Sequence, residues 1–139
     1  MYVLDTNVIS ELRKTSKGNA NQNVTKWASS VPASALFLSA MTVLELERGT
    51  LLLERHDTRQ GSMLRSWLED QVFAAFAHHI LPIDAVVARR AASLHIPNPR
   101  PERDALIAAT ALVHGMTVAT RNVADFKPMG APFINPWEA

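Results

Sequence analysis

Hydrophobic residues along the chain form short runs that are separated by longer segments of helical spacing. Strands that alternate with helices are typical of an α/β fold built on a mostly parallel sheet. The short runs predict strands or extended segments at Tyr2–Leu4, Ala35–Ser39, Ile80–Ile83, Met116–Thr120 and Pro132–Ile134.

The segments between these runs carry hydrophobic residues at every third or fourth position, which predicts helices. Asp84 is placed to cap a helix at its start, and Gly115 to end one. Gly49 lies inside another predicted helix, where glycine is unfavourable, and so indicates close packing. The helices are expected around Val8–Leu12, Val24–Val31, Thr42–Arg55, Leu64–Phe76, Ala85–Leu94 and Asp104–His114, with a turn or short helix at Asn122–Asp125.

Four acidic residues follow these elements at comparable places. Asp5 ends the first strand, and Glu45 lies in the first turn of the helix after the second strand. Asp104 lies near the start of the helix that leads into Met116–Thr120, and Asp125 lies just past that strand. Strand ends and the starts of the returning helices share one edge of a parallel sheet. We therefore expect the four acids to converge there.

Such convergence requires a cation. Two carboxylates about 4 Å apart repel by roughly 4 kcal/mol at an effective dielectric constant of about 20. Oxygen ligands without cysteine or histidine select hard ions such as Mg²⁺ or Mn²⁺. These ions polarise a phosphodiester and activate a water molecule, either alone or as a pair about 4 Å apart. The pattern therefore predicts a metal-dependent nuclease.

Each acid also has a purely structural explanation. Asp5 fits a helix cap, Glu45 and Asp104 fit acids that oppose a helix dipole, and Asp125 fits a turn former. Taken singly, each acid is better explained in this way, whereas their joint placement favours the metal site. A non-catalytic binding module therefore stays open. A haloacid-dehalogenase-like phosphotransferase is disfavoured, because it needs a second aspartate where Asn7 stands.

Composition narrows the class of protein further. The 139 residues are 47% hydrophobic and 19% charged, as expected for one globular domain over residues 1–139. The absence of cysteine excludes disulfides, iron–sulfur clusters and thiolate zinc sites, and fits a reducing cytoplasm. No apolar run is long enough for a membrane span, and no signal peptide precedes the first strand. We therefore expect a cytoplasmic protein without a membrane partner.

Three stretches of the sequence, with its terminal FINPWE, resemble a known family. They are similar to the PIN-domain ribonucleases, in particular to the FitB-like branch of the VapC-type toxins of toxin–antitoxin pairs. The resemblance covers essentially the whole chain. It implies an α/β/α sandwich with a mostly parallel sheet, and endoribonuclease activity in which water activated by one or two Mg²⁺ or Mn²⁺ ions hydrolyses RNA. The stretches are YVLDTNVISEL, SAMTVLELERG and RPERDALIAATALVHGMTVATRNVADF.

The resemblance also implies roles for individual residues and partners. By position, the acidic site of the family corresponds to Asp5, Glu45, Asp104 and Asp125, and its surrounding polar residues to Thr6, Asn7, Thr120 and Asn122. A homodimer is implied, as is a VapB-like antitoxin whose C-terminal tail blocks the site. Operator DNA is expected to bind only through that antitoxin.

Basic residues next to these motifs are candidates for contact with the RNA backbone, although a solvated surface position explains each of them equally well. Arg103 also departs from the family, because an apolar or small residue is expected directly before Asp104. It would contact substrate phosphate or pair with Glu102. The candidates are Arg13, Lys14, Arg100, Arg103 and Arg121.

Overall fold

The central sheet has five strands in the order β3-β2-β1-β4-β5. All pairings between neighbouring strands are parallel in the computed structural model, which describes residues 1–139. All strand ends therefore point to the same edge, and the mostly parallel sheet expected from the sequence is confirmed. The strands are β1 (Tyr2–Leu4), β2 (Leu36–Ser39), β3 (Ile80–Leu81), β4 (Thr117–Ala119) and β5 (Phe133–Ile134).

Helices connect the strands close to where the hydrophobic spacing predicts them. Asp84 caps α6 by accepting from the Val87 N–H at 3.0 Å, and Gly115 ends α7 with a φ of 65°, both as predicted. A π-helical turn (Leu68–Val72) interrupts the helix expected over Leu64–Phe76. The helices are α1 (Thr6–Arg13), α2 (Gln22–Ser30), α3 (Ala40–His56), α4 (Thr58–Trp67), α5 (Phe73–Ala75), α6 (Ala85–Leu94), α7 (Glu102–His114) and α8 (Val123–Phe126).

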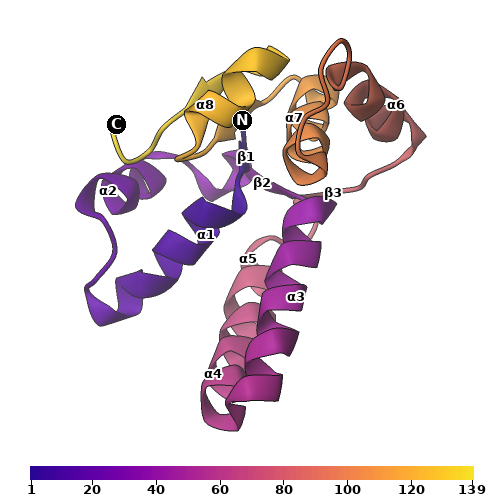
Figure 1. Cartoon of the computed structure of the whole chain (residues 1–139). Coiled ribbons are helices and arrows are strands. Elements are labelled where there is room, and N and C mark those ends of the chain that lie inside the picture. The colour runs from indigo at the N-terminus through magenta and orange to yellow at the C-terminus, as the bar shows by residue number, and fades with distance from the viewer.

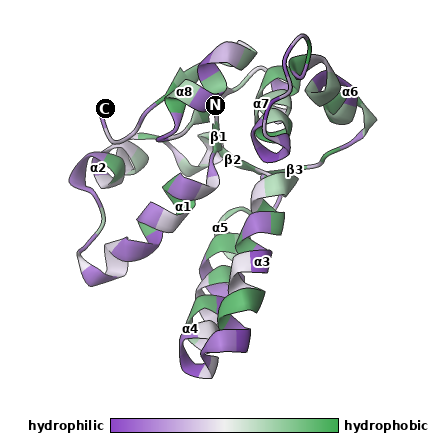
Figure 2. Ribbon diagram, in the orientation of Figure 1, coloured by the Kyte–Doolittle hydropathy of each residue, from purple (hydrophilic) through white to green (hydrophobic).

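The sheet separates two hydrophobic clusters. Val3 of β1 packs with residues of α6, α7 and α8, whereas Leu4 packs with residues of α1, α2 and the π-helical turn. Successive strand residues face opposite sides, so β1 contributes to both clusters. The helices lie on either side of the strands in Figure 1, and Figure 2 shows hydrophobic residues on the strands between them. This is the expected α/β/α sandwich.

Helices α3 and α4 form a hairpin that extends away from the sheet (Figure 1). Gly61 is buried where they meet, and a Cβ atom there would lie 2.4 Å from the Glu54 Cα. Arg65 of α4 donates to Glu47 at 2.6 Å and to Glu54 at 3.0 Å, both on α3. Gly49 has no neighbour that a Cβ would meet within 4 Å, so its interpretation as a mark of close packing is wrong.

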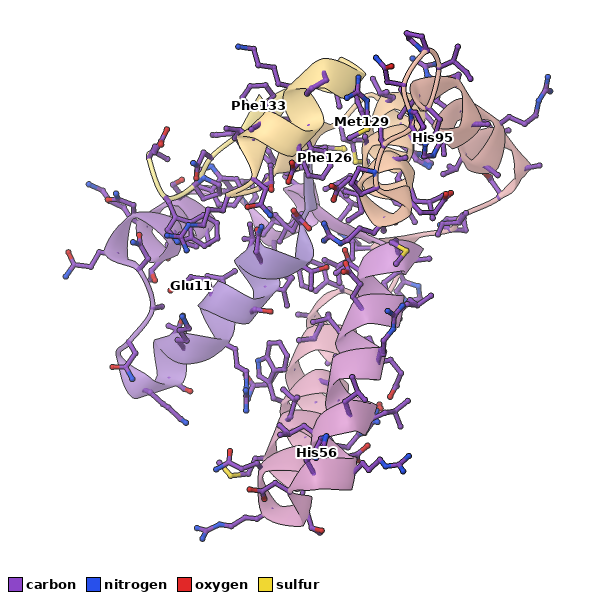
Figure 3. The ribbon with its side chains drawn as sticks, in the orientation of Figure 1. Glu11, His56, His95, Phe126, Met129 and Phe133 are labelled. Carbon is purple, nitrogen blue, oxygen red and sulfur yellow. The ribbon has the colours of Figure 1, made fainter.

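Helix α8 is fixed near the end of β4 by residues that turn inward. Phe126 and Met129 are buried in the cluster that contains α7 (Figure 3). This packing sets the position of Asp125, which is exposed on the same helix. No helix combines the length and the apolar character that crossing a membrane requires.

Candidate active site

Asp5 lies at the end of β1 and is fully buried. Its Oδ1 accepts from the Thr6 N–H at 2.7 Å, so the helix-cap role considered for Asp5 is confirmed. The carboxylate does more than cap α1, however. Thr120 Oγ1 donates to its Oδ2 at 2.8 Å, and Arg103 Nη2 donates to its Oδ1 at 2.6 Å. Asp5 therefore links the end of β1 to β4 and α7.

Glu45 projects from α3 towards Asp5. Ser39 caps α3, which places Glu45 in the second turn of the helix and not in the first turn as predicted. A role in opposing the helix dipole is therefore weak, because that effect fades within the first turn. The Glu45 carboxylate instead accepts from Thr6 Oγ1 at 2.6 Å and from Arg103 Nε at 2.6 Å.

Arg103 supplies the positive charge at the centre of the acids. Its guanidinium donates to Asp5, to Glu45 and, through Nη1, to Asp104, which is 4% exposed. The expected pairing of Arg103 with Glu102 is wrong, since the Glu102 carboxylate lies 3.8 Å from His95 Nε2 instead. The cation that the crowded acids require is thus present within the chain.

Burial and charge act together on the ionisation of this cluster. Burial raises the pKa of Asp104, and the neighbouring Asp5 and Asp125 carboxylates raise it further, against the opposing effect of Arg103. Burial alone would lower the pKa of Arg103, but its hydrogen bonds to Glu45 and Asp5 outweigh burial and raise it. Arg103 therefore keeps its charge among the carboxylates.

Asp125 differs from the other three acids. Its backbone N–H donates to the Asn122 carbonyl at 3.0 Å, but its exposed carboxylate makes no hydrogen bond. Its charge contributes, together with that of Asp5, to the raised pKa of Asp104. The structure thus brings together three of the four predicted acids around Arg103 and leaves the Asp125 carboxylate exposed and outside these hydrogen bonds.

All four polar residues expected around the site contact it or each other. Thr6 and Thr120 donate to Glu45 and Asp5, as described. Asn7 Nδ2 donates to Asp5 Oδ2 at 3.3 Å, and the Asn122 N–H donates to Thr120 Oγ1 at 2.9 Å.

One residue near this centre was not among those predicted from the sequence. Thr42 is buried, and its Oγ1 lies 3.3 Å from that of Thr6. The sequence spacing could have identified Thr42, because it lies on α3 three residues before Glu45 and therefore on the same helix face.

Two cavities flank the acidic centre and contain most of the predicted basic residues. One, of about 510 Å³, is lined by Arg103, Arg121 and Lys14 together with Trp137. The other, of about 380 Å³, is lined by Arg13, Lys14, Glu45 and Trp67.

Each cavity contains an arginine next to a tryptophan ring. The guanidinium of Arg13 lies 5.6 Å from the Trp67 ring centre, and that of Arg121 lies 5.3 Å from the Trp137 ring centre. Arg100 lines neither cavity; its N–H donates to His95 Nδ1 at 3.0 Å. Four of the five basic candidates therefore lie beside the acids.

The donor atoms suit a hard divalent cation, but their arrangement does not hold one while Arg103 lies among them. Carboxylate oxygens are the ligands that Mg²⁺ and Mn²⁺ prefer. Asp5, Glu45 and Asp104 supply them from three separate segments. No group of three or more acidic or histidine side chains is placed to hold a metal ion. The three converging carboxylates face the guanidinium instead.

Comparisons of the sequence and the structure with known proteins identify the family of the chain. The PIN domain model matches residues 2–129. The chain is 38% identical to the VapC ribonuclease Y4jK of Sinorhizobium fredii, over 99% of each chain. It is 37% identical to the toxin FitB of Neisseria gonorrhoeae, again over 99% of each. The crystal structure of FitAcB from Neisseria gonorrhoeae superimposes with a TM-score of 0.90 at 35% identity, over the whole of both chains. The chain therefore belongs to the PIN-domain family.

Proposed function

We propose that this chain is a metal-dependent endoribonuclease that acts as the toxin of a toxin–antitoxin pair. The observation that carries the proposal is the meeting of Asp5, Glu45 and Asp104 on one positive charge at the edge where the strands end. A protein that used these acids only to cap helices would not need to bring them together. The similarity to a VapC ribonuclease and to the toxin FitB supports the reaction and the role.

The residues of the acidic centre would have different roles in the hydrolysis of RNA. A divalent cation, when bound, supplies positive charge that polarises the phosphodiester and lowers the pKa of water. Asp5, Glu45 and Asp104 would hold it, while Asp125, which is exposed and without a hydrogen bond, would accept a proton from the attacking water. Thr6 and Thr120 would fix the carboxylates through the hydrogen bonds described above.

The two cavities beside the acidic centre are the proposed binding site of the RNA substrate. Lys14 lines both cavities, and Arg13 and Arg121 line one each. These side chains would attract the RNA backbone without regard to its sequence. The acidic centre between them would then meet one phosphodiester of the bound strand.

The family resemblance supports further partners of the proposed toxin. We place the protein in the cytoplasm as a homodimer, with residues 1–139 forming one domain. A VapB-like antitoxin would block the acidic centre with its C-terminal tail, and operator DNA would be bound through that antitoxin alone.

Substitution of single acids tests the proposed reaction. Asp5→Asn and Asp104→Asn should each lower Mg²⁺- or Mn²⁺-dependent RNA cleavage by about a hundredfold or more. Their circular dichroism spectra should stay close to that of the unaltered protein. Glu47→Gln is the matched control, because Glu47 is also on α3 but pairs with Arg65 of the hairpin. Full cleavage by either aspartate variant, or an equal loss in the control, would contradict the proposed site.

Growth of bacteria tests the proposed role as a toxin. Expression of the chain without a partner should arrest growth, whereas expression of the Asp5→Asn variant should be tolerated. Equal arrest by both forms at matched protein levels would show that the toxicity does not depend on the acidic centre.

A further inference from the structure

Arg103 uses almost its whole guanidinium group on the acidic centre. Nη2 donates to Asp5 Oδ1 at 2.6 Å and to Glu45 Oε1 at 2.9 Å, while Nε donates to Glu45 Oε2 at 2.6 Å. Nη1 donates to Asp104 Oδ1. One side chain thus engages three carboxylates from three different segments, which is far more than an incidental surface ion pair provides.

The position of Arg103 on α7 does not explain this arrangement. Arg103 is the second residue of the helix, where the helix dipole disfavours a positive charge and favours the acids Glu102 and Asp104. The guanidinium is therefore held there, against the helix dipole, by Asp5 and Glu45 of other segments together with Asp104 of its own helix. Of its two neighbours on the chain, Asp104 accepts a hydrogen bond from it, whereas Glu102 lies next to His95.

The same carboxylate oxygens cannot serve Arg103 and a metal ion at once. A Mg²⁺ ion needs oxygen ligands at about 2.0–2.1 Å in a near-octahedral arrangement. Here four of the six carboxylate oxygens of Asp5, Glu45 and Asp104 accept hydrogen bonds from Arg103, and the two cations would repel each other. No metal-binding arrangement of acids exists while the guanidinium is in place.

We propose that Arg103 is a built-in competitor of the divalent cation. Its guanidinium occupies the acidic centre in the metal-free protein and turns away when the ion binds. This inference rests on the proposed function, because it assigns a regulator to the metal site described there. A competitor of this kind weakens the apparent affinity for metal, because the ion can bind only during the fraction of time when the acids are uncovered.

The side chain has room to turn away. It is 30% exposed, and it lines the cavity of about 510 Å³ together with Lys14, Arg121 and Asn122. Rotation about its own bonds would move the guanidinium into this cavity without a change in the backbone of α7. There it joins the two other basic side chains that would face the RNA backbone.

Binding of Mn²⁺ without RNA tests the competition directly. Arg103→Met keeps most of the side-chain volume and removes the charge. If the guanidinium covers the acids about nine-tenths of the time, this variant should bind Mn²⁺ about tenfold more tightly than the unaltered protein in isothermal titration calorimetry. Arg121→Met is the control, since it removes a charge from the same cavity but contacts none of the acids. Its affinity should change much less.

A second variant keeps the competition testable if Arg103→Met does not fold. Arg103→Lys keeps one charge, but its single ammonium group cannot reach three carboxylates in the manner of the guanidinium. Its Mn²⁺ affinity should lie between those of the unaltered protein and Arg103→Met. Weaker or unchanged Mn²⁺ binding by the folded Arg103 variants would overturn the proposal.

Nuclear magnetic resonance of the unaltered protein gives an independent measure. The Nε–H of Arg103 should be protected from exchange without metal and should lose this protection on saturation with diamagnetic Mg²⁺. Persistence of the protected signal at saturating Mg²⁺ would also overturn the competition. Failure of the proposed function looks different, because then no variant would bind Mn²⁺ and Asp5→Asn would leave RNA cleavage intact.

Discussion

At the scale of single residues, Asp5 shows how a structural role and a chemical role coexist in one side chain. It caps α1, yet three side chains besides the backbone of Thr6 also donate to it, from Asn7, Arg103 and Thr120. A fully buried carboxylate needs such donors, because an unpaired buried charge is strongly unfavourable. The helix-cap explanation was therefore correct but incomplete.

The hydrogen bond from Thr120 to Asp5 should have a measurable effect on stability. Thr120→Val preserves the shape of the side chain but removes the donor to Asp5 at 2.8 Å and the acceptor of the Asn122 N–H at 2.9 Å. We expect the free energy of unfolding to fall by about 1–3 kcal/mol, because a buried acceptor loses a partner. Thr117→Val in the adjoining strand β4 is the control, since Thr117 makes no side-chain hydrogen bond. Urea denaturation of both variants measures the difference, and equal losses would contradict this account of Thr120.

At the scale of elements, local signals predicted the strands and the helix ends well. Asp84 and Gly115 act through their own side chain or their own φ, so their roles can be inferred from the neighbouring sequence. The α3–α4 hairpin depends on contacts between helices, and the sequence did not reveal it. The polar stretch from His56 to Ser62, which lies between the helices predicted at Thr42–Arg55 and Leu64–Phe76, is mostly helical because Asp57 caps α4 within it.

The two glycines of the hairpin offer a matched test of this difference. Gly61→Ala should lower the free energy of unfolding by about 1–3 kcal/mol, because its Cβ would collide with the Glu54 backbone. Gly49→Ala should raise it by about 0.5–1 kcal/mol, since alanine favours a helix and the added Cβ meets nothing. Thermal and urea unfolding of both variants test the signs. Effects of the same sign would show that the close approach at Gly61 is relaxed in solution.

At the scale of the whole molecule, parallel topology explains why the convergence of distant acids was predictable. Asp5 and Asp104 lie 99 positions apart along the chain, yet both stand at the shared edge of the sheet. The place of Arg103 was not predictable in this way. Its direction depends on which of several charged neighbours a long, flexible side chain reaches, and that information is absent from local spacing. The exposed position of Asp125 was missed for a related reason, because it depends on how α8 packs.

The distribution of charge over the molecule leads to a prediction about RNA binding. The net charge is only +1, but Lys14 and Arg121 lie beside the acidic centre. In the Asp5→Asn background, Lys14→Ala or Arg121→Ala should each reduce the slope of log affinity against log salt by about 0.7 for single-stranded RNA. Arg59→Ala, an exposed change on α4, should leave the slope unaltered. Fluorescence anisotropy across a salt series measures these slopes, and a slope unchanged by all three substitutions would exclude the cavities as the RNA path.

The two outermost strands have a consequence for how this protein meets other chains. β3 and β5 contain only two residues each, so the rims of the sheet present very few unpaired backbone groups. Long free rims invite a foreign strand to continue the ladder, which leads to aggregation. The two-residue strands β3 and β5 offer a foreign strand very few backbone groups with which to pair. We therefore expect a polypeptide that binds this molecule to recognise helix surfaces and loops by their side chains, which permits more sequence selectivity than backbone pairing alone.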